Sequence, residues 1–188
     1  MSRREFTGAI AGTIILFIAS LAVAIVATHT YPAIGDGFVT LFRDAILGDI
    51  NGDTSAMLAV KVFLNNLQAC IILFLGGASL GLLTAFVLAT NGLVIGAIIE
   101  VVREERGIVF VLAAILPHGI FEVPAFVIAG ALGFLLARGL WQDLQGTGDA
   151  NVTALRLGRH FVTIVVPLIA VAAIIEAFIT PEIIQLLA

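Results

Sequence analysis

Residues 8–30, with the sequence GAIAGTIILFIASLAVAIVATHT, form an apolar run of over 20 residues that contains no Asp, Glu, Lys or Arg. As a helix rising about 1.5 Å per residue, this run can cross the roughly 30 Å hydrocarbon core of a bilayer. Arg3 and Arg4 precede it, as they would in a signal peptide, but the apolar region of a signal peptide is only about 7–15 residues long. The run therefore predicts a retained transmembrane helix.

The composition of the whole chain supports this interpretation. Of its 188 residues, 61% are hydrophobic and 12% are charged, and the mean hydropathy is +1.17. A soluble domain carries roughly 25% charged residues and could not bury so much apolar surface at this size. Soluble enzymes, disordered regulators and disulfide-rich secreted folds are excluded. The net charge of −4, without a basic patch, gives no sign of nucleic-acid binding.

Four further apolar bands predict an all-α, polytopic transmembrane helical bundle with about five hydrophobic bands in a single domain, residues 1–188. The third band contains the charged run 103–107, and we expect this band to be broken or re-entrant, unless the charged run reaches a membrane interface. Thr180 and Pro181 suggest the start of a short terminal helix. The four bands lie at about residues 58–89, 93–116, 119–140 and 160–179.

Charged residues between the bands predict the orientation in the cell membrane. Arg3 and Arg4 place the N-terminus in the cytoplasm by the positive-inside rule. Residues 31–57 then form an acidic extracytoplasmic loop, in which apolar residues at helical spacing predict an amphipathic surface helix (Phe38, Leu41, Phe42, Ala45 and Ile46). The polar loop 141–159 is cytoplasmic if the third band crosses once.

Ionisable and amide side chains within the bands are the candidate functional residues, because a charge at the bilayer centre costs about 2.5–3.5 kcal/mol on insertion scales. His118 and Glu122 are four residues apart, so their side chains can meet on one helix face. This pair is either a proton- or cation-binding site or a structural pair that fixes helix register. Glu176 is deep only if its helix continues beyond residue 180. The predicted intramembrane polar cluster comprises Asn66, Glu100, His118, Glu122 and Glu176.

Small residues and prolines form a second set of predicted positions, where helices pack closely or bend. These are Gly77, Gly81, Asn91, Gly92, Pro117, Gly119 and Gly133. Pro117 also suits a helix start. Cys70 lies in an apolar run, where a buried small hydrophobe is expected. A zinc hydrolase is disfavoured, because His29 and His160 lie at the ends of bands, far in depth from a central His118. We predict no catalytic residues, no metal ligands and no cofactor.

Three motifs between about residues 63 and 176 carry a family resemblance: FLNN at 63–66, NG at 91–92 with Gly96, and LPHGIFE at 116–122 followed by IAGA at 128–131. Together they resemble the stage II sporulation protein M family. The resemblance implies a small multipass membrane protein. The member from sporulating bacteria anchors two peptidoglycan-degrading partners in an engulfment complex. It also implies that Asn66, Asn91, His118, Gly119 and Glu122 are signature positions of the family.

Three hypotheses about function follow. The leading one is a non-enzymatic membrane scaffold or complex component. The alternative is a small transporter or export component that uses the His118–Glu122 pair as a proton or cation relay. The third, more remote, is an intramembrane metal-dependent hydrolase. The expected partners are the lipid bilayer, a second copy of the chain in a homo-oligomer such as a dimer, and other membrane-associated or cell-envelope proteins.

Overall fold

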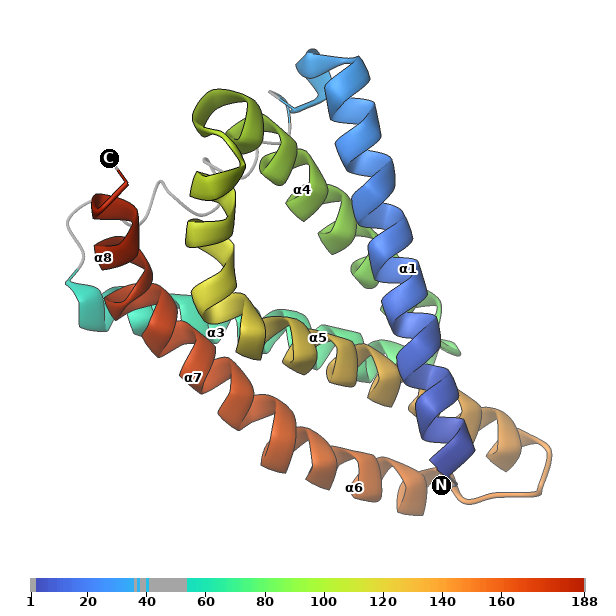
Figure 1. The fold of residues 1–188 in the computed structure, drawn as a ribbon. Helices are drawn as coiled ribbons and strands as arrows, with labels where there is room; N and C mark the ends of the chain where they lie inside the picture. Colours follow the sequence, from blue (N-terminus) through green and yellow to red (C-terminus); the bar gives the residue numbers. More distant parts are fainter. Residues whose placement is uncertain (1–2, 36, 38–39, 41–53, 188) are drawn as a thin grey trace.

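The computed structural model describes residues 3–35, 37, 40 and 54–187, and these residues fold into helices joined by short turns (Figure 1). The part of the chain that the structure describes contains no β-strand. The predicted amphipathic helix around Phe38–Ile46 lies outside the described residues. The α-helices are α1 (Arg3–Thr30), α3 (Ser55–Leu75), α4 (Leu82–Arg106), α5 (Ile108–Leu144), α6 (Ala150–His160), α7 (Val166–Phe178) and α8 (Thr180–Gln185).

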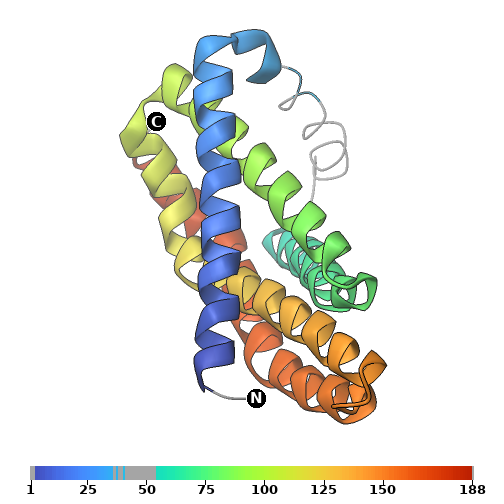
Figure 2. The same ribbon diagram turned by 90° about the vertical axis from the view of Figure 1, so that its right-hand side faces the viewer.

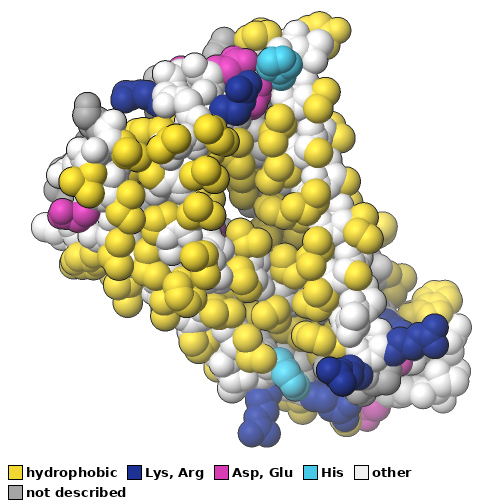
Figure 3. Space-filling view, viewed as in Figure 1, with side chains coloured by type: hydrophobic (Ala, Val, Ile, Leu, Met, Phe, Trp, Pro, Cys, Tyr) yellow, Lys and Arg dark blue, Asp and Glu magenta, His cyan; other side chains and the backbone are white. Residues whose placement is uncertain are grey.

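Five helical segments of the described chain are long and apolar enough to cross a membrane, which confirms the predicted all-α transmembrane bundle. A space-filling view shows apolar side chains between two ends where charged residues gather (Figure 3). This distribution is the one that a hydrocarbon core between two aqueous interfaces requires. The five segments are Arg3–Thr30, Ser55–Ser79, Leu82–Arg106, Ile108–Leu144 and Ala150–Gln185.

The predicted boundaries of the middle bands were wrong, because two turns lie inside apolar sequence. The band at 58–89 contains a 3-10 turn, Gly76–Ser79, after which Leu80 and Gly81 adopt positive φ angles of 55° and 86° and reverse the chain. The band at 93–116 is broken, as predicted, but the break at Gly107, with φ of 84°, separates two complete helices. The charged run 103–107 thus stands at a helix end and is not part of a re-entrant element.

Pro117 is not the start of a helix, which is a second correction. Helix α5 begins at Ile108 and contains both Pro117 and Pro124. A proline removes a backbone donor and its ring bends the helix, yet transmembrane helices tolerate it because neighbouring groups can satisfy the freed carbonyl. The N-terminal part of α5 runs in a different direction from the rest of the helix in Figure 1.

The last apolar band is longer than predicted at both ends. Helix α6, a π-helical turn at Phe161–Val165, α7 and α8 follow one another as one helical segment that starts within the predicted polar loop 141–159. Asp149 caps α6 by accepting a hydrogen bond from the Val152 amide at 3.0 Å. Thr180 does not act as an N-cap: its hydroxyl donates back to the Ile175 carbonyl at 3.3 Å, so the helical path continues past it.

Close contacts between small residues set the arrangement of the helices. Helices α3, α5 and α7 pack against one another, while α1 lies along α4 and crosses α5 (Figures 1 and 2). Gly77 has no room for a Cβ atom because the backbone of Gly133 lies against it, and Gly133 has none because Leu73 and Thr84 do. Beside them the buried Thr84 hydroxyl donates to the Leu73 carbonyl at 2.8 Å. Gly92 sits against the backbone of α1 at Phe17 in the same way.

Candidate functional site

Three ionisable side chains from two transmembrane segments meet inside the bundle. His118 and Glu122 extend from α5, and Glu176 extends from α7. One ligand atom of each residue lies within 4.8 Å of those of the other two. The His118 Nε2 atom is 4.0 Å from Glu122 Oε2, and their side chains are 16% and 26% exposed. We call these three residues the inner cluster.

Helical geometry explains why the inner cluster forms at this depth. His118 and Glu122 are one turn apart on α5, about ten residues after the helix begins, which is roughly 15 Å along its axis. Because the last segment runs on through residue 185, Glu176 also lies well inside its span. The helical path that was the condition for a deep Glu176 does continue beyond residue 180. The packing of α5 against α7 then brings its carboxylate to His118 and Glu122.

Thr180 is a fourth member of the site that sequence reasoning assigned to helix capping. Its side chain is buried, with 5% exposure, and its Oγ1 atom lies 3.4 Å from His118 Nδ1. The same hydroxyl donates to the Ile175 carbonyl. Thr180 is four residues after Glu176, so both side chains point to the same face of the last segment. That spacing was the available signal, and it becomes meaningful only once α5 is known to lie opposite.

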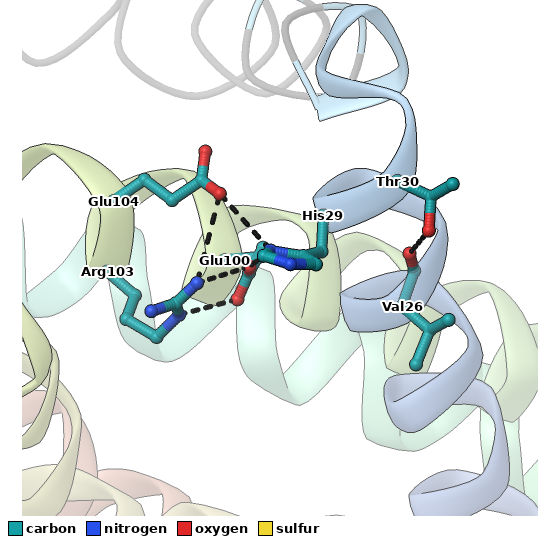
Figure 4. A network of polar contacts seen from close by, with 6 residues as sticks. All are labelled: Val26, His29, Thr30, Glu100, Arg103 and Glu104. Atoms are coloured by element: carbon teal, nitrogen blue, oxygen red, sulfur yellow. Dashed lines mark hydrogen bonds and ion pairs between the residues drawn. The ribbon is translucent and has the colours of Figure 1, made fainter.

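Glu100 belongs to a separate group, at the other end of α4 from the chain reversal, which we call the outer cluster (Figure 4). Glu100 is 3% exposed and accepts hydrogen bonds from Arg103 Nη2 at 2.6 Å and Nε at 2.7 Å. His29 Nδ1 of α1 lies 2.9 Å from Glu100 Oε1 and 3.4 Å from Glu104 Oε1. The outer cluster therefore joins α1 to α4, and no described contact links it to His118.

No hydrogen bond among the described residues joins Asn66 or Asn91 to the inner cluster. Asn66 is half-buried on α3, and its carbonyl oxygen accepts a long 3.5 Å contact from Asn65 Nδ2. The Asn91 amide donates to the Val87 carbonyl of its own helix at 2.9 Å. At Gly119 a Cβ atom would meet only the Ile115 side chain, at 3.4 Å, so this glycine is not required by close helix packing. Of the five predicted cluster residues, the structure brings together His118, Glu122 and Glu176.

Each cluster offers one imidazole and two carboxylates, a donor set of the kind that binds metal ions. The inner and outer clusters differ in whether a basic side chain already binds their carboxylates. In the outer cluster, the Arg103 guanidinium holds Glu100 by two hydrogen bonds. In the inner cluster, no Lys or Arg among the described residues contacts Glu122 or Glu176. The inner cluster is therefore the one with carboxylate oxygens available to a cation.

Comparisons with known proteins agree with the motifs in the sequence. The family model for stage II sporulation protein M matches residues 13–181. An uncharacterized protein of Methanocaldococcus jannaschii is 31% identical over 127 residues, which cover 65% of this chain and 71% of that protein. A second uncharacterized protein of the same organism is 28% identical over 132 residues, or 68% of this chain and 58% of the relative. No solved structure gives a significant match.

Proposed function

Since the chain belongs to the stage II sporulation protein M family and is built as a multipass membrane protein, we propose that it binds a cation within the bilayer and passes it across. The inner cluster is the proposed binding site. This proposal is the transporter alternative of the sequence analysis, with Glu176 added to the His118–Glu122 pair. The protein is proposed to lie in the cell membrane with a cytoplasmic N-terminus.

The convergence of His118, Glu122 and Glu176 carries the proposal. A structural role in fixing helix register needs one complementary polar pair, whereas here two carboxylates from different helices come together. Two carboxylates at this distance repel each other in a medium of low dielectric constant, and a cation between them removes that repulsion. Ionisable groups inside transmembrane segments are expensive and characteristically mark ion pathways.

Flux measurements on the purified full chain in proteoliposomes test the proposal. We expect entry of a divalent cation or of protons, followed with an indicator trapped inside, to exceed the rate in protein-free liposomes. Glu122→Gln and Glu176→Gln should each reduce that rate by at least tenfold, because each removes one charge from the site. Glu104→Gln, on the exposed side of the outer cluster, is the matched control and should transport normally. Equal rates in wild-type and protein-free liposomes would refute the proposal.

A scaffold function remains the second proposal, and a surface feature favours it. Trp141, Leu144 and Leu155 are 54%, 73% and 76% exposed where α5 ends and α6 begins. Exposed aromatic and aliphatic residues at a helix end are suited to contact a partner protein or the membrane interface. In a scaffold, Trp141→Ala would reduce capture of a cell-envelope partner while cation flux stays at background. Gly77, Gly92 and Gly133 are occupied within the chain, so a homo-oligomer would have to use other surfaces.

A further inference from the structure

We propose that the inner cluster is a binding site for one divalent first-row transition-metal ion, held by His118 Nε2 and by carboxylate oxygens of Glu122 and Glu176. This inference rests on the proposed cation function and names the class of cation. It departs from the sequence-based expectation of no metal, in which His118 and Glu122 were metal ligands only under the remote hydrolase hypothesis and Glu176 was not included. Glu176 reaches His118 through the packing of α7 on α5.

The contacts of Thr180 orient the imidazole for this role. The Thr180 hydroxyl has a single hydrogen, and it donates to the Ile175 carbonyl. With that hydrogen on the carbonyl, the Thr180 oxygen can accept from His118 Nδ1, 3.4 Å away, and we propose the tautomer that carries the imidazole proton on Nδ1. The lone pair of the neutral ring is consequently on Nε2, the nitrogen that faces Glu122. Metal-binding histidines are typically oriented in this way, by a hydrogen bond from the other ring nitrogen.

With this tautomer, the inner cluster consists of acceptors that face one another. The Nε2 lone pair and the Glu122 carboxylate are 4.0 Å apart, too far for a direct hydrogen bond. No described residue donates a hydrogen bond to Glu176, whose nearest ligand atoms are those of His118 and Glu122. Ligand atoms that share a metal at about 2.0–2.2 Å lie roughly 3–4 Å from one another. A small contraction of the inner cluster would therefore bring all three into coordination.

In the outer cluster, the same residue types have a structural role, because an ion pair holds two helices together. There Arg103 supplies the positive charge, and its Nη2 and Nε atoms lie 2.6 and 2.7 Å from Glu100. Contacts of this length satisfy the carboxylate without a metal. The inner cluster has no corresponding arginine or lysine among the described residues, so its carboxyl groups are compensated either by protons or by a bound cation, and only the cation uses all three side chains as ligands. The inner and outer clusters each contain one histidine and two glutamates, so they can be compared directly within one protein.

The donor set indicates the class of metal. Calcium and magnesium take oxygen ligands, usually six or more, whereas an imidazole nitrogen favours ions such as Zn²⁺, Fe²⁺ and Ni²⁺. Three protein ligands leave at least one coordination position for water or for an exchanging ligand. The side chains of His118 and Glu122 are 16% and 26% exposed, so the protein does not enclose the inner cluster completely. A site with an open position can release its ion, as transport requires.

Metal binding by the full chain in detergent or nanodiscs tests this inference. After chelator treatment and dialysis against Zn²⁺ or Co²⁺, we expect one ion per chain by elemental analysis, and a visible absorption band typical of Co²⁺ bound by nitrogen and oxygen. Glu176→Gln and His118→Gln should weaken binding by at least tenfold. Glu104→Gln and Glu100→Gln, in the outer cluster, should bind like the wild type. Size-exclusion elution checks that each variant is folded.

Substitutions at Thr180 separate this role from general stability. Thr180→Val removes the hydroxyl that orients His118 and should lower metal affinity about 10- to 100-fold, whereas Thr180→Ser keeps the hydroxyl and should preserve it. Absence of bound metal in the wild type, or undiminished binding by Glu176→Gln, overturns the inference. Metal binding without flux would refute the proposed transport alone, and proton flux without metal binding would refute this inference alone.

Discussion

Single glycines decide how closely the membrane helices approach. A Cβ atom at Gly133 would overlap the Leu73 carbonyl oxygen and lie 2.7 Å from the Thr84 hydroxyl, whereas one at Gly12 would meet no atom within 4 Å. Helices in a membrane gain little from hydrophobic exclusion between them, so close packing of this kind supplies much of their association. Glycine at position 133 is therefore a packing requirement, while glycine at position 12 is not.

Gly133→Ala should destabilise the protein by about 1–3 kcal/mol, the usual range for overpacking a core, because α3 has to move away from α5. Thermal unfolding in detergent, compared at equal detergent concentration, measures the loss. Gly12→Ala is the control and should leave the unfolding midpoint unchanged or slightly higher, since alanine favours the helix more than glycine does. Equal midpoints for the two variants would contradict the packing argument.

At the scale of elements, polar contacts in the outer cluster connect α1 to α4. Glu100 is buried and is held from its own helix by Arg103 and from α1 by His29 (Figure 4). An ion pair that is well bonded adds little net stability over an apolar pair, but removal of one partner leaves a buried charge without compensation. We therefore expect the packing of α1 on α4 to be weakened more by the loss of Arg103 alone than by the loss of both Glu100 and Arg103.

Arg103→Gln should lower the unfolding midpoint clearly, and the double variant Glu100→Gln/Arg103→Gln should recover most of the loss, because no unpaired carboxylate remains. Thermal unfolding of the two variants and of the wild type measures the effect. Glu104→Gln, which removes an exposed carboxylate from the same group, should change the midpoint less than Arg103→Gln does. A double variant less stable than Arg103→Gln would show that the pair itself stabilises the fold.

At the scale of the whole molecule, arginines gather at one end of the bundle. Arg138 pairs with Glu5 at 2.8 Å, which brings the start of α1 to the C-terminal part of α5. Lys and Arg side chains are seen at both ends of the molecule in Figure 3, and those at the end of the outer cluster include Arg103, which is paired with Glu100. Positive charge is retained on the cytoplasmic side during insertion. With five crossings, the C-terminus would be on the other side from the N-terminus.

Labelling of introduced cysteines with a membrane-impermeant maleimide tests this topology. Gly146→Cys, in the exposed turn before α6, should react only after the cells are permeabilised, and Glu182→Cys, exposed on α8, should react in intact cells. Native Cys70 is fully buried and provides a low background. Labelling of both positions from the same side would exclude five crossings.

The sequence by itself determined that this is an all-α membrane protein with about five apolar segments, and it placed His118 and Glu122 on one helix face. Both results depend on local properties: the length and apolarity that a bilayer demands, and the 3.6-residue helical period. The boundaries failed at residues 76–81 because that turn is made of glycine and apolar residues, which hydropathy does not distinguish from a helix.

Only the tertiary structure decided which polar residues share a site. Glu176 and Thr180 join His118 because α7 packs on α5, and Glu100 is taken out of the group by Arg103 and by His29 of α1. These pairings lie 54 or more residues apart in the chain or depend on where α4 ends. The sequence pattern of a single helix cannot predict these pairings, because they depend on how the helices contact one another.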